Sequence, residues 1–326
     1  MIAAPVTHPA PAGVPLQSTP AAATATLVDS SIFVFRAWHS RGEQPDRHGR
    51  PGGAVHGFAH SLCQWLPQVP HGALAFAFDA SLRSGFRHRL YPAYKAHRPP
   101  APEALRAQFQ RIREMLDCLG LTQLADPEFE ADDLIATLAA SARRRGDRVE
   151  VYSADKDLAQ AILGSEDRLR DPERGTSLSR RDIERRMRIR PDQVADLLAL
   201  AGDRTDNVPG LTGVGPGIAA RLLRRFGDLE GILADPSGVR RSGIRAAARI
   251  AEQIESGGGT LRLARRLTGL VADIPGLPDG PELLPRGPAA DAPQRLAELG
   301  VDAFQRTRLV RIAADLAERA AGAPLQ

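Results

Sequence analysis

Lysine is almost absent from this chain of 326 residues. Of its 43 basic residues only Lys95 and Lys156 are lysines, and the rest are arginines. Both lysines lie inside the motifs described below. Because arginine prevails everywhere else, these two positions indicate a need for a compact, flexible ammonium group rather than a planar guanidinium.

Cysteine and long apolar runs are also scarce. Cys63 and Cys118 are the only cysteines, too few for a disulfide framework and without the spacing of zinc ligands. A reducing, cytoplasmic location is therefore expected. No stretch approaches the roughly 18 uninterrupted apolar residues of a membrane span, so no membrane partner is expected. Residues 1–25 lack the features of a secretory signal and are expected to form a disordered leader.

Positive charge is concentrated in one segment, although the formal net charge is only +4. Between residues 81 and 113 the only acidic residue is Glu103. The basic residues there are Arg83, Arg87, Arg89, Lys95, Arg98, Arg106, Arg111 and Arg113. A solvated surface is the ordinary explanation of such a run. Close to an acidic metal site, however, it favours a polyanion such as nucleic acid that bridges the two.

Carboxylates gather in three clusters, each where an apolar segment meets a turn or a helix. The clusters are Glu130-Ala131-Asp132-Asp133, Asp155-Lys156-Asp157 and Asp203-Arg204-Thr205-Asp206, and Asp29 and Asp79 end two further apolar runs. Taken singly, acids at such places are ordinarily capping or turn residues. Together they repel one another unless a divalent cation neutralises them, and Mg²⁺ and Mn²⁺ prefer oxygen ligands. The clusters therefore predict metal-dependent phosphate chemistry.

Strands and helices alternate in the first part of the chain. We expect strands at 25–29, 74–79, 121–125 and 148–153, and helices at 31–40, 54–66, 103–119 and 131–145. This order predicts an α/β fold with a largely parallel sheet. Asp29, Asp79 and Asp155 would then meet at the carboxyl ends of the strands, where such sheets bind ligands.

From residue 179 onward the pattern is helical. A turn rich in glycine, at residues 208–215, joins a helix that ends before Gly202 to one that covers residues 218–226. Backbone amides at the start of the second helix can hold a phosphate without reading bases. Glycine-rich turns between helices are, however, often only structural.

In this order the motifs resemble the 5′→3′ exonuclease and flap endonuclease family, in particular the N-terminal nuclease domain of bacterial DNA polymerase I. The resemblance runs from about Leu27 to Asp273. Its motifs are Leu27-Val28-Asp29-Ser30-Ser31, Ala77-Phe78-Asp79, Phe86-Arg87, Tyr91-Pro92-Ala93-Tyr94-Lys95-Ala96-His97-Arg98 and the three acidic clusters, the last continuing to Gly215. No polymerase part follows, so a free-standing relative is expected.

The resemblance implies a twisted, mostly parallel sheet flanked by helices, of the PIN-like 5′ nuclease kind. A helical arch is expected at about 81–113, and a helix-three-turn-helix, or helix-hairpin-helix, element at about 197–225. The implied domains are a catalytic α/β domain at 26–190 and a helical DNA-binding region at 191–326.

The resemblance also implies roles for single residues. One Mg²⁺ or Mn²⁺ ion would lie mainly on Asp29, Asp79, Glu130 and Asp132, and a second mainly on Asp155, Asp157 and Asp203; Asp133 and Asp206 would bind through water or anchor other ligands. Lys95 and Arg98 would be the catalytic pair that holds the scissile phosphate, and Tyr94 would stack on an unpaired base. DNA contacts are expected from Arg87, which could instead simply pack, and from Gly213 and Gly215.

Two details of the turn complete these expectations. Relatives usually carry a lysine just after the glycine turn, where this chain has Gly215-Pro216-Gly217-Ile218. A phosphate contact is thereby lost, and nearby Arg221, Arg224 and Arg225 are expected to compensate, with the backbone amides still available. A K⁺ ion is a further expectation, bound by the backbone carbonyls of Leu200, Ala201, Pro209, Leu211 and Val214.

The expected function is a structure-selective 5′ nuclease that acts on DNA ends, flaps, junctions or RNA primers in replication or repair, with a separate DNA polymerase as a candidate partner. One alternative is a catalytically idle module that binds DNA ends or flaps, which the retention of all nine carboxylates argues against. A second is a PIN-type ribonuclease. The basic segment and the helical turn favour DNA over RNA.

Overall fold

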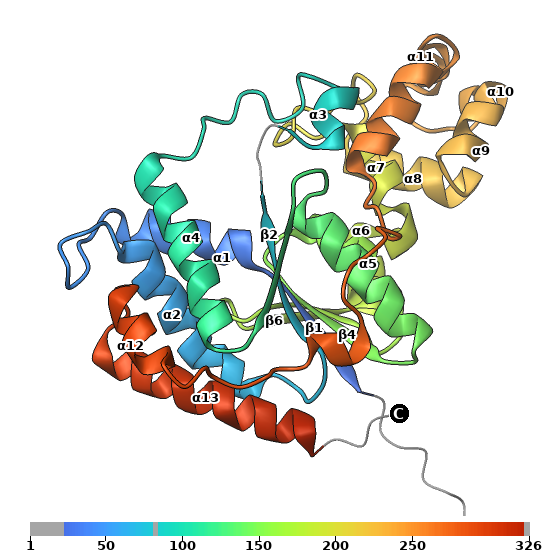
Figure 1. Cartoon of the computed structure of the whole chain (residues 1–326). Helices are drawn as coiled ribbons and strands as arrows, with labels where there is room; N and C mark the ends of the chain where they lie inside the picture. Colours follow the sequence, from blue (N-terminus) through green and yellow to red (C-terminus); the bar gives the residue numbers. More distant parts are fainter. Residues whose placement is uncertain (1–22, 81–83, 323–326) are drawn as a thin grey trace, which may run out of the picture.

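The computed structural model describes residues 23–80 and 84–322, and Figure 1 shows a central sheet between two groups of helices. The strands are β1 (Thr24–Asp29), β2 (Leu74–Asp79), β3 (Thr122–Asp126), β4 (Arg148–Tyr152), β5 (Arg168–Asp171) and β6 (Thr176–Ser179), in the order β3-β2-β1-β4-β5-β6. All neighbours pair in parallel except β5 and β6, which are antiparallel. The largely parallel sheet is thus confirmed. Arg83 and most of the expected leader at residues 1–25 lie outside the described residues. The end of that segment is ordered, because β1 already begins at Thr24.

The two faces of the sheet carry side chains of different size. In β2, Leu74, Phe76 and Phe78 belong to one buried cluster, whereas Ala75 and Ala77 belong to the other. Successive side chains of a strand point to opposite faces, so the sequence Leu-Ala-Phe-Ala-Phe assigns large residues to one face and small ones to the other. Both faces of β2 are covered by helices, which explains why Asp79 is the only polar residue in this strand.

Five helices cover the face with the large side chains. They are α1 (Ser30–Arg41), α2 (Gly53–Trp65), α4 (Glu103–Cys118), α12 (Ala292–Glu298) and α13 (Ala303–Ala321), with the 3₁₀ helix η1 (Leu66–Gln68). The helical DNA-binding region expected at 191–326 included α12 and α13, and the structure corrects this assignment. Leu296, Leu309 and Ile312 are buried in the same cluster as β2, so α12 and α13 complete the core of the α/β part.

The opposite face is covered by α5 (Ala131–Arg144), and a helical lobe lies beyond it (Figure 1). The remaining elements on this side are α6 (Arg180–Met187), α7 (Val194–Ala201), α8 (Pro216–Phe226), α9 (Leu229–Ala234), α10 (Pro236–Arg240), α11 (Ala247–Thr268) and the 3₁₀ helices η2 (Lys156–Ala161), η3 (Pro191–Gln193) and η4 (Gly280–Leu283). The glycine-rich turn joins α7 to α8 as expected.

The basic segment crosses from the helical lobe to α4 above the carboxyl ends of the strands (Figure 1). It contains one short helix, α3 (Phe86–Leu90), then consecutive turns, and Pro99, Pro100 and Pro102 lead into α4. The arch was expected to extend to residue 113, but it ends before α4. Leu105 and Ile112 are buried, which shows that α4 packs into the core. In the described residues no helix is both long and apolar enough to cross a membrane.

Candidate metal and nucleic-acid site

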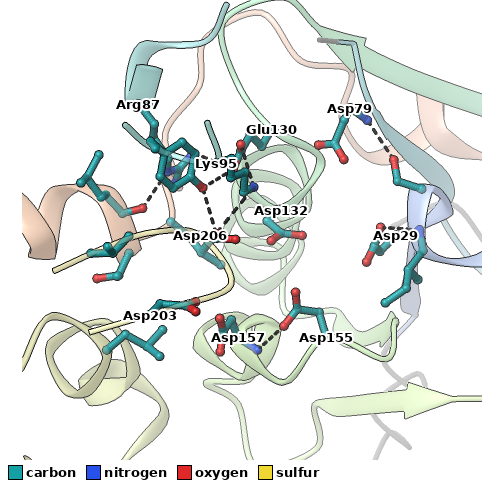
Figure 2. A pocket seen from close by; sticks show the side chains of 18 of the residues that line it. Asp29, Asp79, Arg87, Lys95, Glu130, Asp132, Asp155, Asp157, Asp203 and Asp206 are labelled. Atoms are coloured by element: carbon teal, nitrogen blue, oxygen red, sulfur yellow. Dashed lines mark hydrogen bonds and ion pairs between the residues drawn. The ribbon is translucent and has the colours of Figure 1, made fainter. Parts of the chain in front are cut away.

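A cavity of about 230 Å³ opens at the carboxyl ends of the strands. Eight of the nine predicted carboxylates line it, together with both predicted catalytic cations; in Figure 2 they converge from separate elements. These residues are Asp29, Asp79, Glu130, Asp132, Asp155, Asp157, Asp203 and Asp206, with Lys95 and Arg98. Segments far apart in the sequence therefore form one acidic site with two cations in its wall.

The neighbouring strands β1 and β2 fix the first two carboxylates. Asp29 and Asp79 are the last residues of these strands, so parallel pairing brings both to the same edge. Asp29 Oδ2 accepts a hydrogen bond of 2.7 Å from Ser153 Oγ, and Asp79 Oδ1 accepts one of 2.9 Å from the Ala131 amide at the start of α5. Asp29 Oδ1 also accepts a long hydrogen bond of 3.5 Å from the Ile32 amide, and both carboxylates line the cavity.

The loop after β4 supplies the next pair. Ser153 Oγ accepts a hydrogen bond of 2.9 Å from the Asp155 amide, and Asp155 Oδ1 accepts one of 2.8 Å from the Asp157 amide. These bonds start the 3₁₀ helix η2 and hold both carboxyl groups at the cavity. Asp157 Oδ1 is buried and has no hydrogen-bond partner among the described residues. A buried oxygen without a partner is costly, so this atom is suited to accept a bound cation.

Burial and mutual repulsion raise the pKa of the carboxyl groups on this side. For Asp29 burial, and then the charges of Asp79 and Asp155, raise the pKa to about 7. For Asp157 burial and the charge of Asp155 also raise it to about 7. The pKa of Asp132 lies well above its usual value for the same two reasons. Lys156 and Lys95 counteract these effects at Asp157 and Asp132 only in part, and such incomplete neutralisation is the electrostatic condition that a divalent cation relieves.

The carboxylate oxygens that line the cavity are the type of ligand that hard cations such as Mg²⁺ prefer. In the described part of the chain, no three acidic, histidine or cysteine side chains are already gathered closely enough to hold an ion. Carboxylates that repel one another stay apart when no cation lies between them.

The other side of the cavity contains its own cations (Figure 2). Lys95 Nζ lies 2.9 Å from Glu130 Oε1 and 3.6 Å from Asp206 Oδ2, and Arg98 donates to Asp206 Oδ1 over 2.6 Å. Burial alone would raise the pKa of Glu130, but Lys95 and Arg87 outweigh it, and the pKa lies below its usual value. Burial alone would lower the pKa of Lys95, yet the charge of Glu130 reverses this effect and the pKa is raised.

The backbone also ties the basic segment to the loop that carries Asp206. Lys95 has a φ of 51°, in the left-handed region, and its amide donates to the Asp206 carbonyl over 3.0 Å. Asn207 Nδ2 donates to the Ala93 carbonyl over 2.8 Å. A left-handed lysine carries backbone strain, so this turn is held by its contacts rather than by local preference.

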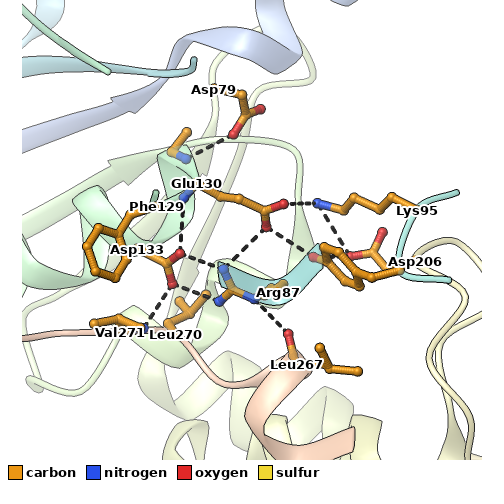
Figure 3. Close-up of polar contacts among 12 residues, drawn as sticks. Asp79, Arg87, Lys95, Phe129, Glu130, Asp133, Asp206, Leu267, Leu270 and Val271 are labelled. Carbon is orange, nitrogen blue, oxygen red and sulfur yellow. Dashed lines mark hydrogen bonds and ion pairs between the residues drawn. The ribbon is translucent and has the colours of Figure 1, made fainter. Parts of the chain in front are cut away.

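Asp133, the one predicted carboxylate that does not line the cavity, forms a buried ion pair with Arg87, which does (Figure 3). Two guanidinium nitrogens of Arg87 donate to the Asp133 carboxylate over 2.6 and 2.8 Å. Arg87 also donates to the Leu267 and Gly269 carbonyls, at the end of α11, over 2.8 Å each. Since both side chains are buried, Arg87 is not placed to contact DNA, and Asp133 anchors α3 and α11 to α5 rather than facing a metal.

Tyr94 is likewise not placed for its expected role. Only 2% of the residue is exposed, and its hydroxyl donates to Glu130 and Asp206 over 3.0 and 3.1 Å. A buried ring cannot stack on a base that arrives from solvent. A stacking surface that the sequence analysis missed lies in an adjoining cleft, which shares Asp79 with the cavity and is lined by Phe35 and Phe109.

One sequence signal could have pointed to Phe35. Phe33, Val34 and Ala37 form the buried side of α1, so Phe35 lies off that side on a helix that starts directly after Asp29. Its ring centroid lies 5.5 Å from that of Phe109. Phe35 packs only partly against the core and lies close to a predicted metal ligand, so it is a candidate for contact with a base.

The turn between α7 and α8 exposes Gly213, Gly215 and Arg221, as contact with DNA would require. Of the carbonyls proposed for K⁺, that of Leu200 accepts from the Leu211 amide over 2.9 Å, and that of Leu211 accepts from the Val214 amide over 3.0 Å. Both the DNA contacts and the K⁺ site stay predictions.

Comparison with known proteins gives two family models that match most of the chain. The model of the 5′-3′ exonuclease N-terminal resolvase-like domain matches residues 24–194, and that of the 5′-3′ exonuclease C-terminal SAM fold matches residues 189–291. The chain belongs to the 5′-3′ exonuclease family. Members of this family are hydrolytic nucleases, and the family expected from the motifs is thereby confirmed.

Individual relatives agree with this assignment. A 5′-3′ exonuclease of Aquifex aeolicus is 36% identical over 211 residues, which cover 64% of this chain and 72% of that protein. A thermostable DNA polymerase I of Thermus thermophilus is 37% identical over 249 residues, or 76% of this chain and 29% of the polymerase. The chain thus spans less than a third of the length of the polymerases that it matches.

Solved structures of 5′-3′ exonuclease relatives confirm the fold. A structure of T5 5′-exonuclease with bound zinc has a TM-score of 0.59 at 18% identity and covers 90% of this chain and 99% of that one. The catalytic core of Rad2 in complex with DNA substrate has a TM-score of 0.54 at 15% identity, covering 93% and 95%. The residues that match the C-terminal SAM-fold model include helices α7 to α11.

Proposed function

We propose that this member of the 5′-3′ exonuclease family is a structure-selective 5′ nuclease that hydrolyses DNA phosphodiester bonds at 5′ ends and flaps. Replication or repair is the setting we propose, and a DNA polymerase that acts on the same ends is the proposed partner. The observation that carries this proposal is the single cavity in which eight carboxylates meet Lys95 and Arg98.

Two Mg²⁺ or Mn²⁺ ions would be held in this cavity. Asp29, Asp79, Glu130 and Asp132 are the proposed ligands of one ion, and Asp155, Asp157 and Asp203 those of the other, with Asp206 in support. Bound ions would supply Lewis-acid chemistry, by activating the attacking water and neutralising charge on the leaving oxygen. The raised pKa values on the β1 and β4 side and the unpartnered Asp157 Oδ1 support this assignment.

Lys95 and Arg98 are proposed to bind the scissile phosphate. Both line the cavity, where Lys95 is paired with Glu130 and Arg98 with Asp206. A phosphate oxygen beside these groups would accept hydrogen bonds from both, and the two cations would stabilise the negative charge that grows in the transition state. Glu130 and Asp206 thus hold the two cations in place until substrate binds.

Recognition of DNA is proposed to use two further surfaces. Backbone amides of Gly213 and Gly215, with Arg221 of α8, would bind the duplex through its phosphates. The cleft lined by Phe35 and Phe109 would receive an unpaired base beside the site of cleavage. The similarity to a 5′-3′ exonuclease and to DNA polymerases, and to the Rad2 catalytic core in complex with DNA substrate, supports DNA as the substrate.

The deciding experiment is cleavage of a flap duplex labelled at its 5′ end. Purified protein would be assayed with Mg²⁺, with Mn²⁺ and with EDTA, beside Asp155→Asn and the matched control Glu318→Gln, whose residue is exposed on α13. We expect metal-dependent release that only Asp155→Asn abolishes. Tight flap binding without cleavage in either metal would indicate an idle binding module, and preferential cleavage of single-stranded RNA would indicate a ribonuclease.

A further inference from the structure

A second basic surface lies outside the cavity, on α6 and the residues that follow it. Residues 180–190 contain six arginines, at positions 180, 181, 185, 186, 188 and 190. Three of them meet the end of α8 at an open cleft of about 610 Å³. Its charged lining residues are Arg185, Arg188, Arg190, Arg224 and Glu184.

Positive charge in this cleft is incompletely neutralised. Glu184 is paired with Arg180 over 2.9 Å, and Arg190 with Asp192 over 3.0 Å. Such exposed pairs are weak and exchange readily for other partners. Arg188 and Arg224 form no ion pair with any residue that the structure describes. The cleft therefore offers two unpaired guanidinium groups and others that can be recruited.

Arg188 occupies an unusual backbone conformation. It ends α6 with φ 59° and ψ 27°, in the left-handed region where glycine is the ordinary residue. The side chain is exposed, so packing does not account for an arginine at this strained position. An exposed, strained and unpaired arginine at the wall of a cleft suggests a ligand with negative charge.

The position of the cleft on α8 indicates which ligand fits. Arg221 and Arg224 lie one turn apart on the exposed side of α8, whose first residue follows the turn at 208–215. Arg224 is eight residues beyond Pro216, so it lies about 12 Å along the helix axis from the amides of that turn. This length corresponds to three or four nucleotide steps of a duplex strand.

We propose that the cleft between α6 and α8 binds the phosphate backbone of the duplex arm of the substrate, beyond the contact made by the turn. This inference rests on the proposed function. Guanidinium groups dominate the lining, and its apolar members, Ile189 and Leu223, are buried. Such a surface reads charge rather than base sequence, and it would orient the duplex without contacting the reacting phosphate.

The test is equilibrium binding of flap DNA in Ca²⁺ or EDTA, measured over a range of salt concentrations. The variant is Arg188→Gly/Arg224→Ala, in which glycine also relieves the strained backbone; Arg188→Asn replaces Arg188→Gly should the first variant not fold. The control, Arg308→Ala/Arg311→Ala, removes the same charge from the exposed side of α13. Each protein binds one flap with a duplex arm of about 20 base pairs and one of about 6.

With the long arm, we expect the slope of log K against log salt to shrink by about 2 in the variant, because two phosphate contacts are lost. The short arm and the control should keep the slope of the unchanged protein. An unchanged slope with the long arm, or an equal change in the control, would overturn the inference. Flap cleavage in Mg²⁺ is measured separately. Absence of cleavage would contradict the proposed function, whereas the salt dependence of binding would still test the role of the cleft.

Discussion

The two sides of the acidic cavity differ in how their charge is balanced. On the side of β1 and β4, no internal cation outweighs the burial and mutual repulsion of Asp29 and Asp157, and their pKa values rise to about 7. On the side of the basic segment, Lys95 and Arg98 are paired with Glu130 and Asp206. One side thus depends on cations from solution, whereas the other carries its own.

This difference shows how one cavity can prepare for two kinds of ligand. A site that binds a metal keeps most of its carboxylates incompletely neutralised, at a cost in stability, and Glu130 is the proposed ligand that is already paired with a cation. A site that binds a phosphate must keep cations close by, and carboxylates can hold them in place until the phosphate arrives. Separation of the two allows metal and phosphate to bind side by side.

The largest expected effect separates the two sides by activity. Asp155→Asn should lower turnover by about 100-fold or more, because it removes a proposed metal ligand from the side without cations. Asp206→Asn should cost clearly less, since Asp206 is paired with Arg98. Single-turnover cleavage of a flap at saturating Mg²⁺ measures both, while flap binding in EDTA should stay largely intact. Equal losses in the two variants would remove the distinction.

The next effect concerns the cations. Lys95→Ala should reduce the rate of the chemical step by roughly 10²–10³, since its ammonium is proposed to stabilise charge in the transition state. Binding of the flap should weaken much less. The measurement is single-turnover rate at saturating substrate beside the equilibrium dissociation constant, with Arg308→Ala, an exposed cation on α13, as control. An unchanged rate at saturation would mean that Lys95 has no role in the reaction.

Protein stability should also distinguish the two sides as the pH rises without metal. The carboxyl group of Asp29 keeps its proton in the folded state up to a pH of about 7, but in the unfolded state only to about 4. Stability should therefore fall between these values and remain low above them. At pH 8 in EDTA, Asp29→Asn should raise the free energy of unfolding, by about 2–4 kcal/mol. Mg²⁺ should stabilise the unchanged protein more than this variant.

Glu130 should behave in the opposite way. Its pKa is lowered in the folded state, so its contribution is present above the unfolded pKa of about 4 and is lost as the pH falls through the lower folded value. Glu130→Gln should destabilise the protein at pH 8 in EDTA by roughly 1–3 kcal/mol, because Lys95 loses its closest partner. Urea unfolding at several pH values measures both variants. The same sign for Asp29→Asn and Glu130→Gln would contradict the comparison.

The smallest expected effect lies away from the cavity, at the turn between α7 and α8. If the carbonyls of Leu200, Ala201, Pro209, Leu211 and Val214 bind K⁺, duplex affinity should rise modestly in K⁺ at constant ionic strength. Binding would be compared in potassium and in a bulky organic cation. Equal affinities would rule out a K⁺ site and leave the amides of Gly213 and Gly215 as the contact.

The gathering of carboxylates could be predicted because it follows from strand ends. Asp29 and Asp79 each close an apolar run, and parallel neighbours bring such ends together. The pairing of charges could not be predicted in this way. Arg87 and Asp133 are distant in sequence and meet only because α3 and the end of α11 pack beside α5. From the sequence alone, an arginine in a basic segment is indistinguishable from one that contacts DNA.

Two parts of the fold escaped prediction for physical reasons. β5 and β6 have the sequences RLRD and TSLS, too short and polar to give a strand pattern, and they form at the edge of the sheet by pairing with each other and with β4. The helices α12 and α13 could be recognised as helical, but their place against β2 could not, because an amphipathic helix does not specify which apolar surface it covers.

The place of α13 has a consequence for synthesis of the protein. This helix covers a sheet whose first strand starts at Thr24, so both ends of the described chain contribute to one core. At about 5–20 residues per second, a ribosome would finish all the acidic motifs several seconds before that helix emerges. During this interval the large side chains on one face of the sheet lack part of their cover. The nascent chain would thus hold every proposed metal ligand before α13 completes this core.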